Sequence, residues 1–198
     1  MLLFADDVLL LALSRATLSA IYIAFRSFCT AHRLTISKPK AKAMVARDAS
    51  VGNSIDLAGD VYEVVSTFRY LGVMLDSTGG TAPILGHIAT SAARGFGGLC
   101  DFLGVHGWST VWTRLVLYDV YVRTHLTFAC ATWAPYYLEM GHLESRDSQF
   151  GKLANQYRRG LRILTGMRPE VRVEVLHVAV LRWPLEVAVA KATWRYYK

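Results

Sequence analysis

The sequence predicts an α+β protein with two parts, one built from short strands and one built from helices. In residues 1–78, short apolar runs alternate with turn-forming Gly, Pro and Asp residues, which is the pattern of antiparallel hairpins. In residues 79–198, apolar side chains recur three or four positions apart, as they do on one face of a helix. We therefore expect hairpins and a helix in the first part and helices in the second.

The composition is that of a folded protein with a basic surface. The chain is 53% hydrophobic and 19% charged, which excludes a disordered or low-complexity class. Its net charge is +7, and residues 142–198 hold 11 basic and 5 acidic residues, so they account for +6 of it. A basic excess of this kind suggests a polyanionic partner such as nucleic acid.

The cysteines and the apolar segments indicate the compartment. Cys29, Cys100 and Cys130 are odd in number and far apart, which argues against a disulfide framework and a zinc site and favours a reducing environment. The most apolar stretches are interrupted by charges, so we expect no membrane span. We accordingly expect an intracellular protein, cytoplasmic or nuclear. Nothing in the sequence specifies an oligomeric state.

Two adjacent carboxylates, Asp6 and Asp7, stand between the apolar runs Leu2–Phe4 and Val8–Leu13. The simplest structure is a β-hairpin with both aspartates at its tip and its strands in a core. Repulsion and desolvation would destabilise two such charges, and a divalent cation would relieve both. Oxygen ligands of this kind suit Mg²⁺. The alternative for Asp-Asp by itself is a solvated turn.

A helix and a lysine-rich turn follow. Ser14 is suited to cap a helix whose apolar face repeats at helical spacing; that face holds Leu18, Ile21, Phe25 and Phe28. Beyond it, Pro39 predicts a turn, around which Lys38, Lys40 and Lys42 occupy alternate positions. By themselves, the lysines are those of a solvated charge cluster.

Further strands are expected before residue 79. Residues 54–65 alternate apolar and polar side chains around Ala58–Asp60, which predicts a hairpin. Residues 68–76 read as a single strand that ends at the turn of residues 77–80.

The second part reads as a series of helices. We expect them over residues 84–103 and 109–126, with Ser109 as the second N-cap and Pro135 ending the segment that follows. The best-formed helix has Leu143, Phe150, Leu153, Tyr157, Leu161 and Leu164 on one face and Gly166 as its C-cap. Helices over residues 171–180 and from Pro184 onward complete the chain.

A basic stripe lies on another face of the best-formed helix. Arg158, Arg159 and Arg162 follow Asn155 at spacings of three, four and seven, so they share one side. A row of guanidinium groups matches a row of phosphates. The alternative is a solvated surface.

Four segments of the chain resemble motifs of one protein family, and they occur in the same order as in that family. Phe4-Ala5-Asp6-Asp7 resembles the aromatic-Ala-Asp-Asp box of reverse transcriptases. Leu34–Met44 resembles the next palm motif of non-LTR retrotransposon enzymes, with Lys40 at its lysine, Ser37 for Asn and Ala41 for Thr. Phe68-Arg69-Tyr70-Leu71-Gly72 resembles the Phe-Lys-Tyr-Leu-Gly box, and Leu117-Tyr118-Asp119 with Trp133 resembles a downstream signature. The chain is thus similar to the C-terminal palm and thumb of such a reverse transcriptase.

The resemblance implies a fold and a set of roles. Residues 1–78 would be the C-terminal part of a polymerase palm, and residues 79–198 a helical thumb and connector. The intact parent would be an RNA-directed DNA polymerase that joins a deoxynucleotide to a primer 3′-hydroxyl by two-metal nucleotidyl transfer. Its partners would be an RNA template, a DNA primer and a dNTP, and its cofactor Mg²⁺.

Individual residues take roles from the same resemblance. Asp6 and Asp7 would be catalytic metal ligands, and Lys40 would hold the leaving phosphates. Phe68, Arg69, Tyr70, Leu71 and Gly72 would form the primer grip. Lys38, Lys42, Arg158, Arg159 and Arg162 would contact nucleic acid.

The family also needs parts that this sequence does not contain. A polymerase palm has another carboxylate on an upstream strand, and its fingers bind the nucleotide. We therefore expect the chain to be inactive alone. Two alternatives stay open, a non-catalytic nucleic-acid-binding remnant of a retroelement and a purely structural helical protein.

Overall fold

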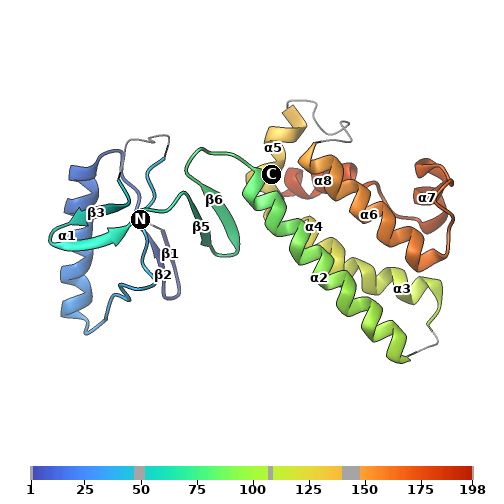
Figure 1. Ribbon diagram of the computed structural model, residues 1–198, viewed down its shortest axis with the longest axis horizontal. Coiled ribbons are helices and arrows are strands. Elements are labelled where there is room, and N and C mark those ends of the chain that lie inside the picture. The colour runs from blue at the N-terminus through green and yellow to red at the C-terminus, as the bar shows by residue number, and fades with distance from the viewer. Residues whose placement is uncertain (1, 47–51, 107–108, 140–147, 198) are drawn as a thin grey trace. The chain divides into compact units, whose positions relative to one another are not determined.

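The computed structural model describes residues 2–46, 52–106, 109–139 and 148–197 (Figure 1). It is a mixed α+β structure, which confirms the coarse fold class. The chain divides into two compact units, residues 1–80 and residues 81–198. We call them unit 1 and unit 2. The division lies two residues beyond the boundary expected at 78.

Unit 1 holds three two-stranded antiparallel hairpins among its described residues. The strands are β1 (Leu2–Phe4), β2 (Asp7–Leu9), β3 (Ser54–Leu57), β4 (Asp60–Glu63), β5 (Thr67–Tyr70) and β6 (Val73–Asp76). The turn of the second hairpin has positive φ at both central residues, 54° at Ala58 and 85° at Gly59. This is the backbone that a two-residue type I′ turn requires.

The third hairpin corrects the expectation of one strand over residues 68–76. Leu71 (φ 48°) and Gly72 (φ 83°) turn the chain so that Tyr70 pairs with Val73. Gly72 adopts this backbone without steric cost, which makes the reversal accessible. The Phe68–Gly72 box is therefore a strand and its turn rather than the middle of a strand.

The core of unit 1 forms where one helix meets the second hairpin. Helix α1 (Arg15–Ala31) begins as predicted, because the Ser14 hydroxyl accepts the Thr17 N–H at 3.1 Å. The buried core residues are Tyr22, Ile55, Leu57 and Tyr62, with Leu10, Leu18, Ile36, Ala41, Ala43 and Val64 packed against them. After the lysine turn, Ala43 forms one parallel bridge with Val64.

Unit 2 is helical. Its elements are α2 (Ala82–His106), α3 (Val111–Tyr118), the π-helix η1 (Asp119–Arg123), α4 (Thr124–Leu126), α5 (Cys130–Glu139), α6 (Gln149–Thr165), α7 (Val173–Val180) and α8 (Leu185–Tyr196). Helix α2 extends a few residues beyond the expected bounds of 84–103 at each end. Helix α6 ends at Gly166 in the left-handed region (φ 69°), as predicted, whereas Leu143 lies outside the described residues.

Two local predictions in unit 2 are wrong. Thr110, not Ser109, caps α3, because its hydroxyl accepts the Thr113 N–H. Pro135 lies inside α5 instead of ending a segment. A helical proline leaves the carbonyl four residues earlier without a donor, and here the Tyr197 hydroxyl donates to the Ala131 carbonyl at 3.1 Å.

Close helix crossings hold unit 2 together. A Cβ added at Gly160 of α6 would contact the Tyr118 hydroxyl and lie 2.7 and 2.8 Å from two of its ring carbons. A Cβ at Gly95 of α2 would meet the backbone carbonyl of Tyr121. Glycine at these positions therefore lets α6 and α2 approach the α3–η1 segment directly.

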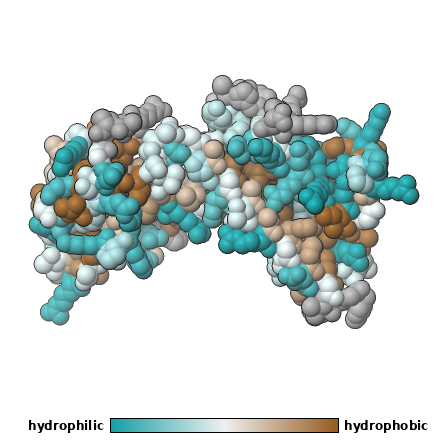
Figure 2. All heavy atoms as spheres, viewed as in Figure 1, coloured by the Kyte–Doolittle hydropathy of each residue, from teal (hydrophilic) through white to brown (hydrophobic). Residues whose placement is uncertain are grey.

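The core of unit 2 includes one side of the segment from α3 to α4. Leu115, Tyr118, Val122 and Leu126 are buried along it, whereas Trp112 is exposed. Figure 2 shows hydrophobic side chains reaching the surface of this unit between hydrophilic ones.

Candidate functional site

The predicted hairpin is present, but its turn lies one residue earlier than expected and its aspartates are not buried. Phe4 pairs with Asp7, so Ala5 and Asp6 form the two-residue turn and Asp7 begins β2. Both aspartates are exposed. Their mutual repulsion is therefore moderated by water, and the desolvation expected for them is absent. The tip still presents two neighbouring carboxylates that are open to a ligand.

The donor set suits a shared metal site rather than a complete one. Mg²⁺ is commonly held by one or two carboxylates together with waters and substrate phosphates, and Asp6 and Asp7 can supply the carboxylates. Among the described residues, no group of three or more His, Cys, Asp or Glu side chains is placed to hold a metal ion. The remaining ligands would have to come from a substrate or another segment.

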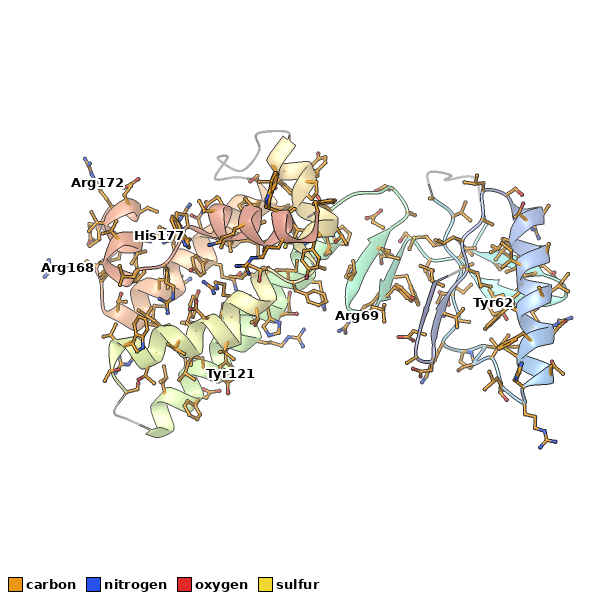
Figure 3. All side chains as sticks on the ribbon, turned by 180° about the vertical axis from the view of Figure 1, so that it is seen from behind. Tyr62, Arg69, Tyr121, Arg168, Arg172 and His177 are labelled. Atoms are coloured by element: carbon orange, nitrogen blue, oxygen red, sulfur yellow. The ribbon has the colours of Figure 1, made fainter. Side chains whose placement is uncertain are left out.

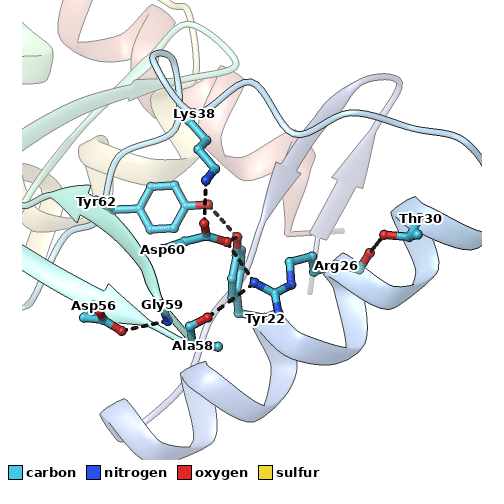
Figure 4. A network of polar contacts seen from close by, with 9 residues as sticks. All are labelled: Tyr22, Arg26, Thr30, Lys38, Asp56, Ala58, Gly59, Asp60 and Tyr62. Carbon is cyan, nitrogen blue, oxygen red and sulfur yellow. Dashed lines mark hydrogen bonds and ion pairs between the residues drawn. The ribbon is translucent and has the colours of Figure 1, made fainter.

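A network of polar contacts connects the lysine turn to the second hairpin (Figure 4). Asp60 of β4 accepts hydrogen bonds from the Tyr22 hydroxyl (2.5 Å), Arg26 (3.1 Å) and the Lys38 ammonium (2.5 Å). The Tyr22 and Tyr62 hydroxyls are 2.7 Å apart. The hydrogen bonds from Lys38 and Tyr22 hold the pKa of Asp60 well below its usual range.

The three lysines of the turn differ in their surroundings. Lys38 pairs with Asp60, and Lys42 pairs with Glu63. Lys40 is exposed, and within the described ranges its side chain has neither a hydrogen bond nor an ion pair. Among the described residues, the predicted cluster is thus two internal ion pairs and one exposed ammonium group that pairs with none of them.

The network around Asp60 was not found from the sequence. Asp60 had been assigned to a turn, and Tyr22 and Arg26 to a helix packing on the core. One signal was present, since Tyr22 lies one helical turn after Leu18 on the apolar face of α1. A buried tyrosine hydroxyl needs a polar partner, so a partner was to be expected across the core.

The primer-grip box is now placed at a hairpin. Phe68 and Tyr70 are half-buried on β5, and Arg69, between them, is exposed (Figure 3). Leu71 is exposed at the turn. The box therefore offers a turn and one cation to solvent, and its assignment to a primer stays a prediction.

The arginine stripe of α6 is divided by its neighbours in unit 2. Arg158 forms a 2.5 Å ion pair with Glu186 of α8, and both side chains are about one fifth exposed. Arg162 donates to the Val171 carbonyl at 3.0 Å. Arg159 is exposed. Of the three, Arg159 is the one whose side chain is directed to solvent.

Further cations lie where α6 leads into α7. Arg168 and Arg172 are exposed and extend outward from the unit (Figure 3). A shallow pocket of about 480 Å³ lies beside them, lined by Arg162, Pro169, Val171, Arg172, Val173 and Glu174. Glu170 and Glu174 are exposed in the same segment, so the junction carries both signs of charge. Arg168 and Arg172 add two exposed cations to Arg159.

The Leu117-Tyr118-Asp119 signature has an internal structural role. The buried Tyr118 hydroxyl donates to the Tyr157 carbonyl at 3.0 Å. Asp119 accepts a hydrogen bond from Arg182 at 2.7 Å, which connects η1 to the segment before α8. Trp133 is also buried, and its indole N–H donates to the Phe128 carbonyl. These residues stabilise the helical unit.

A buried histidine completes this interior. The Nδ1 atom of His177 lies 3.2 Å from the Arg182 carbonyl, an arrangement in which Nδ1–H donates. Its Nε2 atom is buried without a hydrogen-bond partner among the described residues. Burial is the main reason that the pKa of His177 is lowered from 6.5.

No helix of the described residues is both long and apolar enough to cross a membrane. Comparison of the chain with known protein families, curated proteins and solved structures finds no match. The reverse-transcriptase resemblance therefore depends on the motif residues themselves and on the geometry of the segments that carry them.

Proposed function

We propose that this chain supplies the palm carboxylate hairpin and the helical thumb of an RNA-directed DNA polymerase. The observation that carries the proposal is the β1–β2 hairpin. Its two-residue turn exposes Asp6 beside Asp7 at the tip. Carboxylates held next to each other and open to solvent can bind a metal ion together with substrate phosphates.

Each remaining motif has a role in this function. A divalent cation held by Asp6 and Asp7 would stabilise negative charge on the reacting phosphate oxygens. The exposed ammonium of Lys40 can bind the departing phosphates as a point charge. The turn at Leu71–Gly72 would contact the primer, and the exposed Arg159, Arg168 and Arg172 would contact the duplex backbone.

The proposal requires partners for this chain. The described residues contribute two carboxylates to the metal site and no third, so substrate phosphates and a further polypeptide segment would complete it. We expect no polymerisation by the chain alone. The same observation favours the second candidate function, a nucleic-acid-binding remnant that performs no catalysis.

A metal titration tests the site without requiring activity. Mn²⁺ added to the ¹⁵N-labelled chain should broaden the amide signals of residues 2–9 in preference to others. The change Asp6→Asn should abolish the effect, whereas Asp101→Asn, at an exposed position of α2, should not. Broadening that is unaffected by Asp6→Asn would contradict the proposed site.

Primer extension separates the two candidate functions. In a polypeptide that joins this chain to a further palm carboxylate and to nucleotide-binding fingers, Asp6→Ala should reduce primer extension by ~100-fold or more. Loss of a residue that only hydrogen-bonds to a metal ligand already costs up to ~100-fold, and a metal ligand itself should cost at least as much. Duplex binding should persist. If extension is absent or indifferent to Asp6 while duplex binding is retained, the remnant is the correct description.

A further inference from the structure

The lysine turn, residues 37–42, is attached to the β3–β4 hairpin on both sides of Lys40. On one side Lys38 binds Asp60, and on the other Lys42 binds Glu63. Asp60 is the first residue of β4, and Glu63 is its last. The ion pairs therefore anchor the flanks of the turn to one strand, while the middle lysine is exposed and has no ion pair within the described part of the chain.

Backbone contacts reinforce this attachment. The Lys40 and Ala41 N–H groups both donate to the Ser37 carbonyl, at 3.1 and 3.0 Å, which closes the turn. After it, the Ala43 N–H donates to the Glu63 carbonyl at 2.9 Å. Pro39 restricts φ within the turn. The backbone that carries Lys40 is consequently held at both ends.

Asp60 has more cationic partners than its charge requires. Its side chain is 12% exposed and is already bound by Arg26 and by the Tyr22 hydroxyl, both from α1. Arg26 by itself can balance the carboxylate. The additional bond to Lys38, whose side chain is 64% exposed, ties the turn to the core.

We propose that Asp60 is a positioning residue that holds the lysine turn so that the Lys40 ammonium is presented to a polyphosphate. This inference rests on the proposed function, in which Lys40 meets the phosphates of a nucleotide. Lys38 and Lys42 then act as anchors. Asp60 acts through the turn and does not touch the ligand.

The sign of one substitution distinguishes positioning from simple attraction. Asp60→Asn keeps an oxygen acceptor for Tyr22 but removes a negative charge and releases Lys38. If the three lysines attract anions only through their summed field, the variant should bind polyphosphate more tightly. If Asp60 positions Lys40, the variant should bind it less tightly.

The experiment is an NMR titration of the full chain with inorganic tripolyphosphate. We expect Lys40→Ala and Asp60→Asn each to weaken binding by about tenfold, the lower end for a hydrogen bond to a charged group. The double variant should bind no more weakly than Lys40→Ala. The matched control Lys38→Arg keeps the ion pair and should bind like the wild type.

Two further arms keep the outcome decisive. If Asp60→Asn does not fold, Lys38→Met can be used instead, because it releases the turn while Asp60 keeps its bonds to Tyr22 and Arg26. Lys38→Met should weaken tripolyphosphate binding in the wild type but not in the Lys40→Ala variant. Tighter or unchanged binding by Asp60→Asn, beside a loss in Lys40→Ala, would overturn the positioning role and leave the proposed function intact. No loss in Lys40→Ala would overturn this inference, while the metal titration at Asp6 would still decide the function.

Discussion

The crossing of α6 over α3 can be tested by adding one methyl group at Gly160. In Gly160→Ala the new Cβ would contact the Tyr118 hydroxyl and lie 2.7 Å from a Tyr118 ring carbon, against at least 3.4 Å for an ordinary contact. One of the two must move by at least about 0.7 Å, because the hydroxyl oxygen is nearer still. Tyr118 is 1% exposed, so it has no open space into which it could move.

The expected effect combines three contributions. Overpacking of a close-packed interior destabilises by about 1–3 kcal/mol. Displacing Tyr118 weakens its 3.0 Å hydrogen bond to the Tyr157 carbonyl, which contributes about 0.5–1.5 kcal/mol. In the opposite direction, alanine stabilises a helix interior by about 0.5–1 kcal/mol relative to glycine. We expect unit 2 to lose about 2 kcal/mol of unfolding free energy.

Denaturant unfolding followed by tryptophan fluorescence measures this effect, because all five tryptophans lie beyond residue 80 and report on unit 2. The matched control is Gly98→Ala on α2, where an added Cβ meets nothing within 4 Å. That variant should gain about 0.5–1 kcal/mol. Tyr118→Phe should recover part of the loss in Gly160→Ala. If Gly160→Ala is as stable as the wild type, the helices do not cross as described.

Three further predictions concern charge. Because Lys38 and Tyr22 depress the pKa of Asp60, wild-type unit 1 should lose stability as the pH falls below about 4. Unfolding of unit 1, followed by its NMR signals, should depend less on pH in Asp60→Asn than in the wild type. The same pH dependence in both proteins would contradict this role of Asp60. Because burial lowers the pKa of His177, the unfolded chain binds a proton more readily than the folded one. Unit 2 should therefore lose stability as the pH falls below about 6.5. The difference between the melting temperatures at pH 5 and pH 7.5 should be smaller in His177→Gln than in the wild type. Arg159→Ala should reduce the slope of log duplex affinity against log salt concentration by about 1 without changing the stability of unit 2. By contrast, Arg158→Ala should destabilise unit 2 by about 1–3 kcal/mol, because it leaves the Glu186 carboxylate without its ion pair.

Features set by local chemistry could be predicted from the sequence. The tip at Asp6, the N-cap at Ser14 and the C-cap at Gly166 each depend on a few neighbouring residues, and the structure has them where the sequence placed them. The turn at Leu71 could not be predicted in the same way, because leucine rarely adopts positive φ and its apolar neighbours read as one strand.

Features set by distant partners could not be predicted. Lys38 and Asp60 are separated by 22 positions, and nothing local identifies them as a pair. Helical spacing placed Arg158 on a common face with Arg159, but only the packing of α8 reveals that Glu186 binds one of them. The sequence therefore identified the cations of the candidate site without distinguishing the anchored ones from the free ones.

The π turn of η1 has a consequence for changes in chain length. Tyr118 and Leu126 both face the core although they are eight residues apart, a separation that an uninterrupted α-helix would rotate by about 80°. The π turn takes up one residue, so the two side chains align as they would at a separation of seven. Loss of one residue between Asp119 and Arg123 would restore a regular helix with both side chains still facing inward. The same deletion in α6 would turn every later side chain by about 100°. The segment 119–123 is thus a place where the loss of one residue keeps the same side chains buried.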